Sequence, residues 1–284
     1  MPPPDFRGAE IRPGAVSITS HGSLMRARVF AAEQDGPRPA LLLMPGWPGS
    51  TDDVLGLGAA LSVAGITVLT VTQRGMHESE GTTTFANTLD DIGSALDWFR
   101  SPDVVRRYRL DVSRVALGGH SHGGGMALAH AARDPQVHRV IAIAATDYAE
   151  LTRARHRDTS FAALLDNVLR STQAPAGPVR FDIEACYREL AEGQATFGLR
   201  ENAARLADRS ILLVGGWEDV NTPIEQHLLP FYRALRRAGA SDVTFFVHHD
   251  DHGFGRVRDR LASDLTAWIA GDRRRYGVGS AEER

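Results

Sequence analysis

A serine between two glycines is the first feature of this sequence that could do chemistry. Residues 119–123 read G-H-S-H-G, directly after the apolar run Val115–Leu117 and directly before the helix-like residues Gly124–Leu128. A strand, a tight turn and a helix with serine at the apex form a nucleophile elbow, in which glycines let strand and helix approach closely. The hydroxyl of Ser121 would then face a substrate carbonyl. The alternative is a glycine-rich turn with a capping serine, because this motif also occurs by chance.

Two further residues could activate Ser121, whose hydroxyl alone is a weak nucleophile. Histidine suits the general base, because it exchanges protons near neutral pH, and a carboxylate fixes its tautomer. Asp219 and His252 follow Ser121 in that order, each after an apolar strand-like run. The carboxyl ends of such strands meet at one edge of a sheet. The sequence therefore predicts a catalytic Ser-His-Asp triad.

The acid of this triad has two rivals. Glu218 is adjacent to Asp219, and Asp147 ends the preceding strand. Adjacent residues at a strand exit point in different directions, so we expect only one of Glu218 and Asp219 to face His252, and we favour Asp219. Asp219 could alternatively cap a helix before Pro223.

The base lies in a cluster, because residues 248–252 read H-H-D-D-H. His248 and His252 are four residues apart, a spacing that binds a metal on a helix, but this segment leaves a strand. We therefore expect no metal here and interpret His248 and His249 as strand-end or surface residues.

Composition bounds the class of protein. The chain has 284 residues, is 43% hydrophobic and 24% charged, and contains a single cysteine, Cys186. The hydrophobic and charged contents are ordinary for a soluble globular protein. A single cysteine cannot form an intramolecular disulfide. Lysine is absent and all 32 cations are arginine, which excludes a Schiff-base lysine, a Walker A lysine and a Ser-Lys dyad.

Charge and hydropathy also indicate partners and location. The net charge of −3 gives no general attraction to nucleic acid. Residues 1–14 lack the apolar run of a signal peptide, and no apolar run approaches membrane-spanning length. We expect a cytoplasmic protein with a small-molecule substrate, and we leave its oligomeric state open, a homodimer included.

Strand-like and helix-like segments alternate along the chain, which favours a mostly parallel, doubly wound α/β sheet of eight strands. The expected strands are Ala15–Thr19, Leu24–Ala31, Ala40–Met44, Thr67–Thr72, Arg114–Gly118, Val140–Ala144, Ser210–Val214 and Val243–His248. The expected helices are Asp52–Ala64, Phe85–Arg100, Gly123–Ala132, Pro223–Ala238 and Val257–Ala270. The first two strands have no helix between them, which predicts an antiparallel hairpin with its turn at His21-Gly22.

Residues 148–208 interrupt this alternation with helix-like segments at Leu151–His156, Phe161–Arg170, Asp182–Glu192 and Ala203–Leu206. Sixty residues exceed a normal connection between core strands. We interpret them as a helical cap over the carboxyl edge of the sheet, where α/β folds bind ligands. Residues 1–147 and 209–284 would then form the core.

The chain resembles the α/β-hydrolase superfamily in four ordered motifs. Residues 41–50 look like the oxyanion loop, with Pro45 in place of a histidine, and residues 73–81 look like the turn after the next strand, with His77 in place of a glycine. The elbow is the third motif. The fourth pairs residues 216–223 with residues 251–254 and is most similar to the prolyl-oligopeptidase and dienelactone-hydrolase branch.

This resemblance implies a cofactor-free carboxylic ester hydrolase, with thioester or small amide substrates as less favoured options. The backbone N–H groups of Trp47 and His122 would form the oxyanion hole. His77 and Glu78 would line the mouth of the substrate pocket. We interpret Arg74 as structural and His120 as pointing into the sheet. The alternatives are an acyltransferase or lyase on the same fold, or a non-catalytic ligand-binding member.

Overall fold

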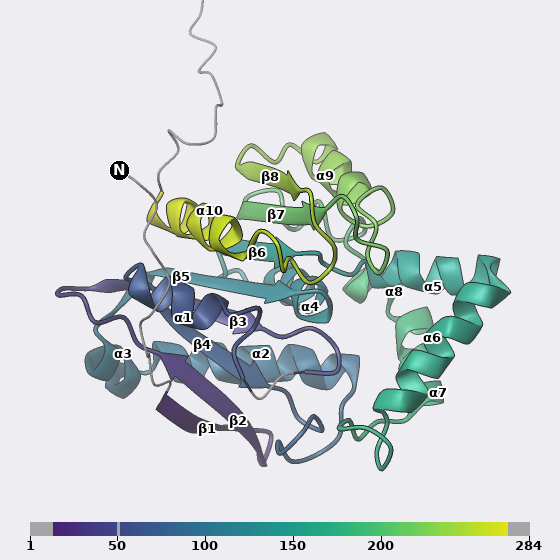
Figure 1. Ribbon diagram of the computed structural model, residues 1–284, viewed down its shortest axis with the longest axis horizontal. Coiled ribbons are helices and arrows are strands. Elements are labelled where there is room, and N and C mark those ends of the chain that lie inside the picture. The colour runs from purple at the N-terminus through teal and green to yellow at the C-terminus, as the bar shows by residue number, and fades with distance from the viewer. Residues whose placement is uncertain (1–13, 50–51, 272–284) are drawn as a thin grey trace, which may run out of the picture.

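The computed structural model describes residues 14–49 and 52–271 and contains one eight-stranded sheet (Figure 1). The strands are β1 (Gly14–Ser20), β2 (Ser23–Phe30), β3 (Arg38–Met44), β4 (Thr67–Thr72), β5 (Leu110–His120), β6 (Arg139–Ile143), β7 (Ser210–Gly216) and β8 (Val243–His248). The helices are α1 (Leu57–Val63), α2 (Phe85–Arg100), α3 (Pro102–Tyr108), α4 (His122–Ala131), α5 (Tyr148–Arg157), α6 (Thr159–Thr172), α7 (Ile183–Glu192), α8 (Gln194–Phe197), α9 (Leu228–Arg237) and α10 (Arg258–Ala270).

The strand order is β1-β2-β4-β3-β5-β6-β7-β8. Strands β1 and β2 form an antiparallel hairpin, β2 is antiparallel to β4, and all later neighbours are parallel. The hairpin turns at His21 (φ 46°) and Gly22 (φ 80°), the left-handed pair that a two-residue turn needs to match strand twist. The predicted fold class and hairpin are confirmed.

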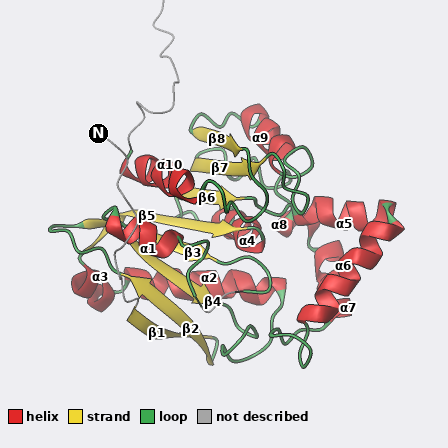
Figure 2. Ribbon diagram, viewed as in Figure 1, coloured by secondary structure: helices red, strands yellow, loops and turns green. Residues whose placement is uncertain are grey.

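The central strands are buried on both faces, which is why they read as continuous apolar runs. In β3, Leu41 and Leu43 pack with α1 and α10, whereas Leu42 and Met44 pack with α2 and α4 on the opposite face. Figure 2 shows α1 and α10 in front of the sheet and α2 and α4 behind it. The parallel strands therefore end at one shared edge between two helical layers.

Helices α5 to α8 form the insertion between β6 and β7, and α5, α6 and α7 gather beyond the carboxyl ends of the parallel strands (Figure 1). Asp147, Asp158 and Asp182 cap the first three of these helices, each through its carboxylate and backbone N–H groups. The division of the chain into a core and a cap domain stays a prediction. No helix in residues 14–49 and 52–271 combines the length and apolar content needed to cross a membrane.

Several element boundaries differ from those predicted. Helix α3 was not predicted, and β5 begins at Leu110 because that residue pairs with Arg38 across an irregularity in the β3–β5 register. Helix α9 begins five residues after Pro223, and residues 203–206 form turns, not a helix.

Candidate active site

Ser121 occupies a strained turn between β5 and α4. Its backbone has φ 55° and ψ −117°, a conformation that costs about 1–3 kcal/mol for a residue with a Cβ. Its N–H donates to the carbonyl of Ile143 at 2.8 Å, and its own carbonyl accepts from Thr146 and Gly125 at 3.2 and 3.1 Å. These bonds to β6 and its exit loop hold the turn in place.

Two glycines of the elbow are required by close contact. A Cβ on Gly119 would lie 2.2 Å from the carbonyl carbon of Gly123, and a Cβ on Gly123 would lie 2.4 Å from the carbonyl oxygen of Met44. Helix α4 thus starts directly against β5 and the end of β3. The interpretation of the motif as a strand-turn-helix elbow agrees with this geometry.

Asp219 and His252 meet at the carboxyl edge of the sheet. Asp219 Oδ2 lies 2.8 Å from His252 Nδ1, and Asp219 Oδ1 accepts from the N–H groups of Asn221 and Thr222, each at 2.9 Å. The Thr222 hydroxyl also donates to Asp219 Oδ2 at 2.7 Å. One oxygen therefore holds the turn while the other contacts the imidazole. No helix begins in this turn, because α9 starts at Leu228, so Asp219 stabilises a turn where a helix cap was the alternative.

Hydrogen bonding keeps this acid ionised. Burial alone would raise the pKa of Asp219, but the bonds from His252 and Thr222 outweigh it and lower the pKa to about 2. Thr222 was not predicted from the sequence, because its contact with Asp219 depends on the shape of the turn.

The rival acids lie elsewhere. The Glu218 side chain is half exposed and pairs with Arg256. Asp147 is fully buried, caps α5 and also accepts from the N–H of Leu199 at 3.3 Å. Burial raises the pKa of Asp147 to about 6. Asp219 is thus the carboxylate of these three that contacts His252.

The neighbours of His252 in the chain are occupied by other contacts. His248 Nε2 lies 3.4 Å from Asp264, Asp250 binds Arg256, and His249 is exposed. Among the described residues, no group of three or more His, Cys, Asp or Glu side chains is arranged to hold a metal ion.

His120 contacts the base directly, contrary to our expectation that it points into the sheet. Its Nε2 lies 2.8 Å from the carbonyl oxygen of His252, and the two rings are 4.7 Å apart. Burial lowers the pKa of His120 to about 4, so the neutral ring donates to that carbonyl at neutral pH. The elbow therefore also supports the backbone of His252.

Trp47 and His122 line the same cavity as Ser121, and their rings are 5.8 Å apart. The N–H of His122 is at the first residue of α4 and has no partner within the helix. No hydrogen bond joins the Trp47 N–H to another described residue. The His122 side chain is buried, contacts the hydroxyl of Tyr148 through Nδ1, and has its pKa lowered by burial to about 4. The oxyanion hole formed by these two N–H groups stays a prediction.

A cavity of about 370 Å³ opens beside these residues. Ser121, His122, His252 and Trp47 line it together with residues of the β4–α2 loop, the β7–α9 loop and helices α5, α6 and α7. Its volume falls within the range of small-molecule sites, about 300–1,000 Å³.

His77 and Glu78 are not among the residues that line this cavity. The N–H of His77 donates to the Pro178 carbonyl at 2.8 Å, and Glu78 borders a separate hollow over β1, β2 and β4. The structure thus brings together Ser121, Asp219, His252, Trp47 and His122, and it leaves these two residues apart.

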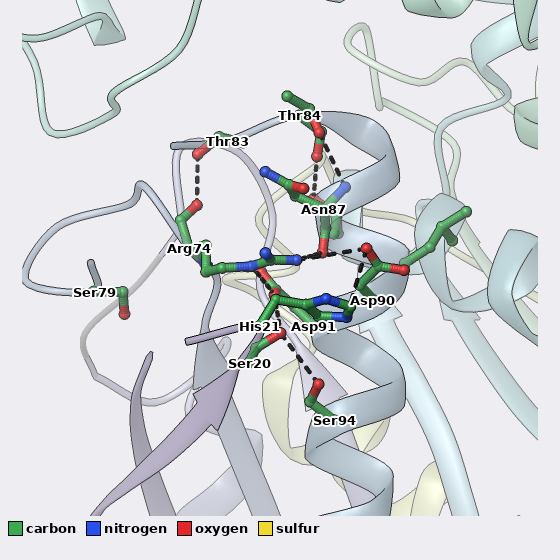
Figure 3. Close-up of polar contacts among 12 residues, drawn as sticks. Ser20, His21, Arg74, Ser79, Thr83, Thr84, Asn87, Asp90, Asp91 and Ser94 are labelled. Carbon is green, nitrogen blue, oxygen red and sulfur yellow. Dashed lines mark hydrogen bonds and ion pairs between the residues drawn. The ribbon is translucent and has the colours of Figure 1, made fainter. Parts of the chain in front are cut away.

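Arg74 holds the β4–α2 loop through polar contacts with Asp91, Asn87 and Thr83 (Figure 3). Its backbone N–H donates to Asp91 Oδ2 at 2.9 Å and its guanidinium bonds Asp91 Oδ1 at 2.5 Å. The Arg74 carbonyl accepts from the hydroxyl of Thr83 at 2.8 Å. Thr83 and the next two residues line the cavity, so the structural interpretation of Arg74 has a specific basis.

The strand order, the elbow at the end of β5 and the acid after β7 together define an α/β-hydrolase fold. The alpha/beta hydrolase fold family matches residues 39–182, about half of the chain, and the chain belongs to this family. The superfamily indicated by the sequence motifs is confirmed.

Comparison with known proteins gives a partial relative by sequence and solved structures of similar fold. A segment of 133 residues is 32% identical to polyketide transferase grgF from Penicillium sp. and covers 44% of this chain but only 42% of that protein. Est1E from Butyrivibrio proteoclasticus superposes with a TM-score of 0.63 at 15% identity, covering 91% of this chain and 98% of the other. The Pyrococcus furiosus esterase Pf2001 superposes with a TM-score of 0.67 at 16% identity, covering 94% and 92%.

Proposed function

We propose that this protein is a serine hydrolase that cleaves a carboxylic ester of a small-molecule substrate. The observation that carries the proposal is the 2.8 Å contact between Asp219 and His252 at the rim of the cavity that Ser121 also lines. The esterases among the solved structures of similar fold agree with this chemistry.

In the acylation step, the Ser121 hydroxyl oxygen attacks the ester carbonyl carbon while its proton passes to His252 Nε2. Asp219 accepts from Nδ1–H and stabilises the imidazolium that forms. The negative oxygen of the tetrahedral intermediate binds the N–H groups of Trp47 and His122, each typically worth about 10²–10³ in turnover. Collapse of the intermediate breaks the ester C–O bond, and His252 returns the proton to the departing alcohol.

In the deacylation step, His252 takes a proton from water as the water oxygen attacks the acyl-enzyme carbonyl. The second tetrahedral intermediate releases the acid, and the Ser121 oxygen recovers the proton from His252. In both steps the protons pass between His252 and Ser121, the alcohol or water, while Asp219 stabilises the imidazolium. The mechanism therefore needs no bound cofactor.

A fluorophosphonate probe together with a panel of activated esters tests this proposal. We expect the probe to label Ser121, and we expect Ser121→Ala to lose labelling and ester turnover in parallel. Turnover retained by Ser121→Ala would end the serine mechanism. A protein that binds the esters but is neither labelled nor active would instead be the non-catalytic ligand-binding member.

The base is tested by a matched pair of histidine substitutions. We expect His252→Ala to abolish turnover, whereas His249→Ala, at an exposed position in the same loop, should leave it within about twofold. Equal loss in both variants would remove the support for His252 as the base.

Acyl transfer is the second candidate, because the relative with 32% identity is named a transferase. Both reactions share the acyl-enzyme, and only the acceptor differs. Adding alcohol, amine or thiol acceptors to the ester assay and separating the products distinguishes them. Transfer products that dominate at millimolar acceptor in water would favour the transferase.

A further inference from the structure

Helix α6 carries its apolar residues on one face, and that face borders the cavity. They recur at the i, i+3, i+4, i+7 and i+8 spacing of an amphipathic helix. The residues are Phe161, Leu164, Leu165, Val168 and Leu169, and all of them line the cavity. The helix therefore presents a continuous apolar surface to the space beside Ser121.

Leu169 of this apolar face packs partly against the core, but the middle of the face lacks the protein partner that such a face ordinarily has. An amphipathic helix of a globular protein normally buries its apolar stripe against the core. None of the residues of α6 is buried, and Leu164 and Val168 are 61% and 46% exposed. Large exposed apolar side chains that gather in a concave site mark a ligand surface.

Polar contacts at its ends and side fix the position of α6. Asp158 caps its first turn, and the Thr172 hydroxyl in its last turn accepts from Trp47 Nε1 at 2.9 Å. Asp166 pairs with Arg155 and accepts from the hydroxyl of Tyr187. These polar contacts hold the helix at its ends and side. On its apolar face, Leu169 packs partly against the core, whereas Leu164 and Val168 stay exposed beside the cavity.

The rest of the cavity wall has the same character. Val220, 86% exposed, lines the cavity from the loop of Asp219, and Leu151, Phe181 and Leu190 add further apolar surface. No aspartate, glutamate or arginine is among the described residues that line the cavity. The arginines of α5 are engaged with acidic partners, Arg157 with Glu150 among them. A charged occupant would lose hydration here without a partner.

We propose that the apolar face of α6 binds a hydrocarbon group of the substrate, so that the preferred ester carries a chain or ring of medium length next to the scissile bond. This inference rests on the proposed function, because the face continues directly into the wall that Ser121 and His252 share. The hydrocarbon can belong to the acid or to the alcohol of the ester, and the test separates the two.

The test compares kcat/KM across two ester series. One series varies the acyl group from acetyl to octanoyl on a constant p-nitrophenol, and the other varies the alcohol of an acetate from ethyl to octyl. We expect at least a tenfold rise with chain length in one series, which assigns the hydrocarbon to that side. In the series that shows this rise, Val168→Asn should lower kcat/KM for the eight-carbon ester at least fivefold. It should change kcat/KM for the two-carbon ester less than twofold. Leu164→Asn provides a second variant at an exposed position of the same face.

Val112→Asn is the matched control, because Val112 is 54% exposed on β5 and is not among the residues lining the cavity. It should alter neither ester. A flat length dependence in both series, or equal losses for short and long esters in Val168→Asn, would overturn the inference. So would a wild-type dimer that Val168→Asn converts to monomer in sedimentation, because a second copy would then occupy the face. If the wild type is not labelled at Ser121 by the fluorophosphonate probe and does not hydrolyse the acetyl ester, the proposed function itself is refuted.

Discussion

At the scale of residues, His252 is held from two sides. Asp219 contacts its ring nitrogen, and His120, next to the nucleophile, contacts its carbonyl oxygen. A histidine in a loop would otherwise have freedom to leave the reactive position. The proposed nucleophile and the proposed base are thus linked through His120, whose side chain contacts the backbone of His252.

The orientation of His252 depends on the charge of Asp219. We expect Asp219→Asn to lower kcat by about 10³–10⁴, because an amide can donate to Nδ1 and stabilise the wrong tautomer. Steady-state kinetics on an activated ester measures the loss. Glu218→Gln, at the exposed neighbouring position, is the control and should stay within about twofold. Equal kcat values for the two variants would contradict the assignment of the acid.

His120 acts as a positioning residue through the backbone of His252. We expect His120→Ala to lower kcat by about 10–10² with KM little changed, because a misplaced base slows chemistry more than binding. His120→Gln, whose amide can still donate to the carbonyl, should recover part of the loss. Kinetics and circular dichroism together check this, and a KM effect without a kcat effect would show that His120 serves substrate binding instead.

At the scale of elements, the β4–α2 loop depends on a buried ion pair. The side chains of Arg74 and Asp91 are 8% and 1% exposed, and the pair links the exit of β4 to α2. We expect Arg74→Met to lower the free energy of unfolding by about 3–5 kcal/mol, since it leaves a buried carboxylate without its cation. Urea denaturation measures the change.

The matched control for this pair is Arg106→Met on α3. Arg106 and Asp103 form an ion pair with both side chains largely exposed, 72% and 88%. Exposed pairs contribute about 0–1 kcal/mol, so this variant should be nearly neutral. A similar small effect for Arg74→Met would mean that water or another group replaces the guanidinium.

The central strands were predictable from sequence because their residues are buried on both faces. The boundaries of the helices were less predictable from sequence. Helix α3 was missed because its seven residues follow α2 after a single break at Ser101. Helix α6 was placed within two residues at either end, but its sequence pattern alone did not show what its apolar face contacts.

At the scale of the whole molecule, buried histidines make stability depend on pH. Burial lowers the pKa of His120, His122 and His227 to about 4 each, below the value of about 6.5 in an unfolded chain. Between pH 6.5 and 4 the unfolded chain therefore binds more protons, and stability falls as pH falls.

Asp147, whose pKa burial raises to about 6, has the opposite effect, and so do Asp53 and Asp91, whose pKa values burial also raises. Burial lowers the pKa of His130 and His248 as well, which adds to the effect of the three histidines.

We accordingly expect the free energy of unfolding to drop by at least about 2 kcal/mol between pH 7 and pH 4.5. Urea titrations at several pH values measure it. His227 Nδ1 accepts from the Asp147 N–H at 3.0 Å, which only the unprotonated ring can do. His227→Gln keeps an acceptor without titrating there, so its pH slope should be shallower. A stability that is constant over this range would show that the histidines titrate alike in both states.

The sequence by itself determined the fold and the order of the reactive residues. Apolar runs specify buried parallel strands, and the residues that follow them must lie at one edge of the sheet. Only the tertiary structure decided which carboxylate meets His252, how His120 supports it, that His77 and Glu78 lie outside the cavity, and where α6 directs its apolar face. Those outcomes depend on side-chain direction at strand exits and on the packing partner of a helix, and neither follows from spacing along the chain.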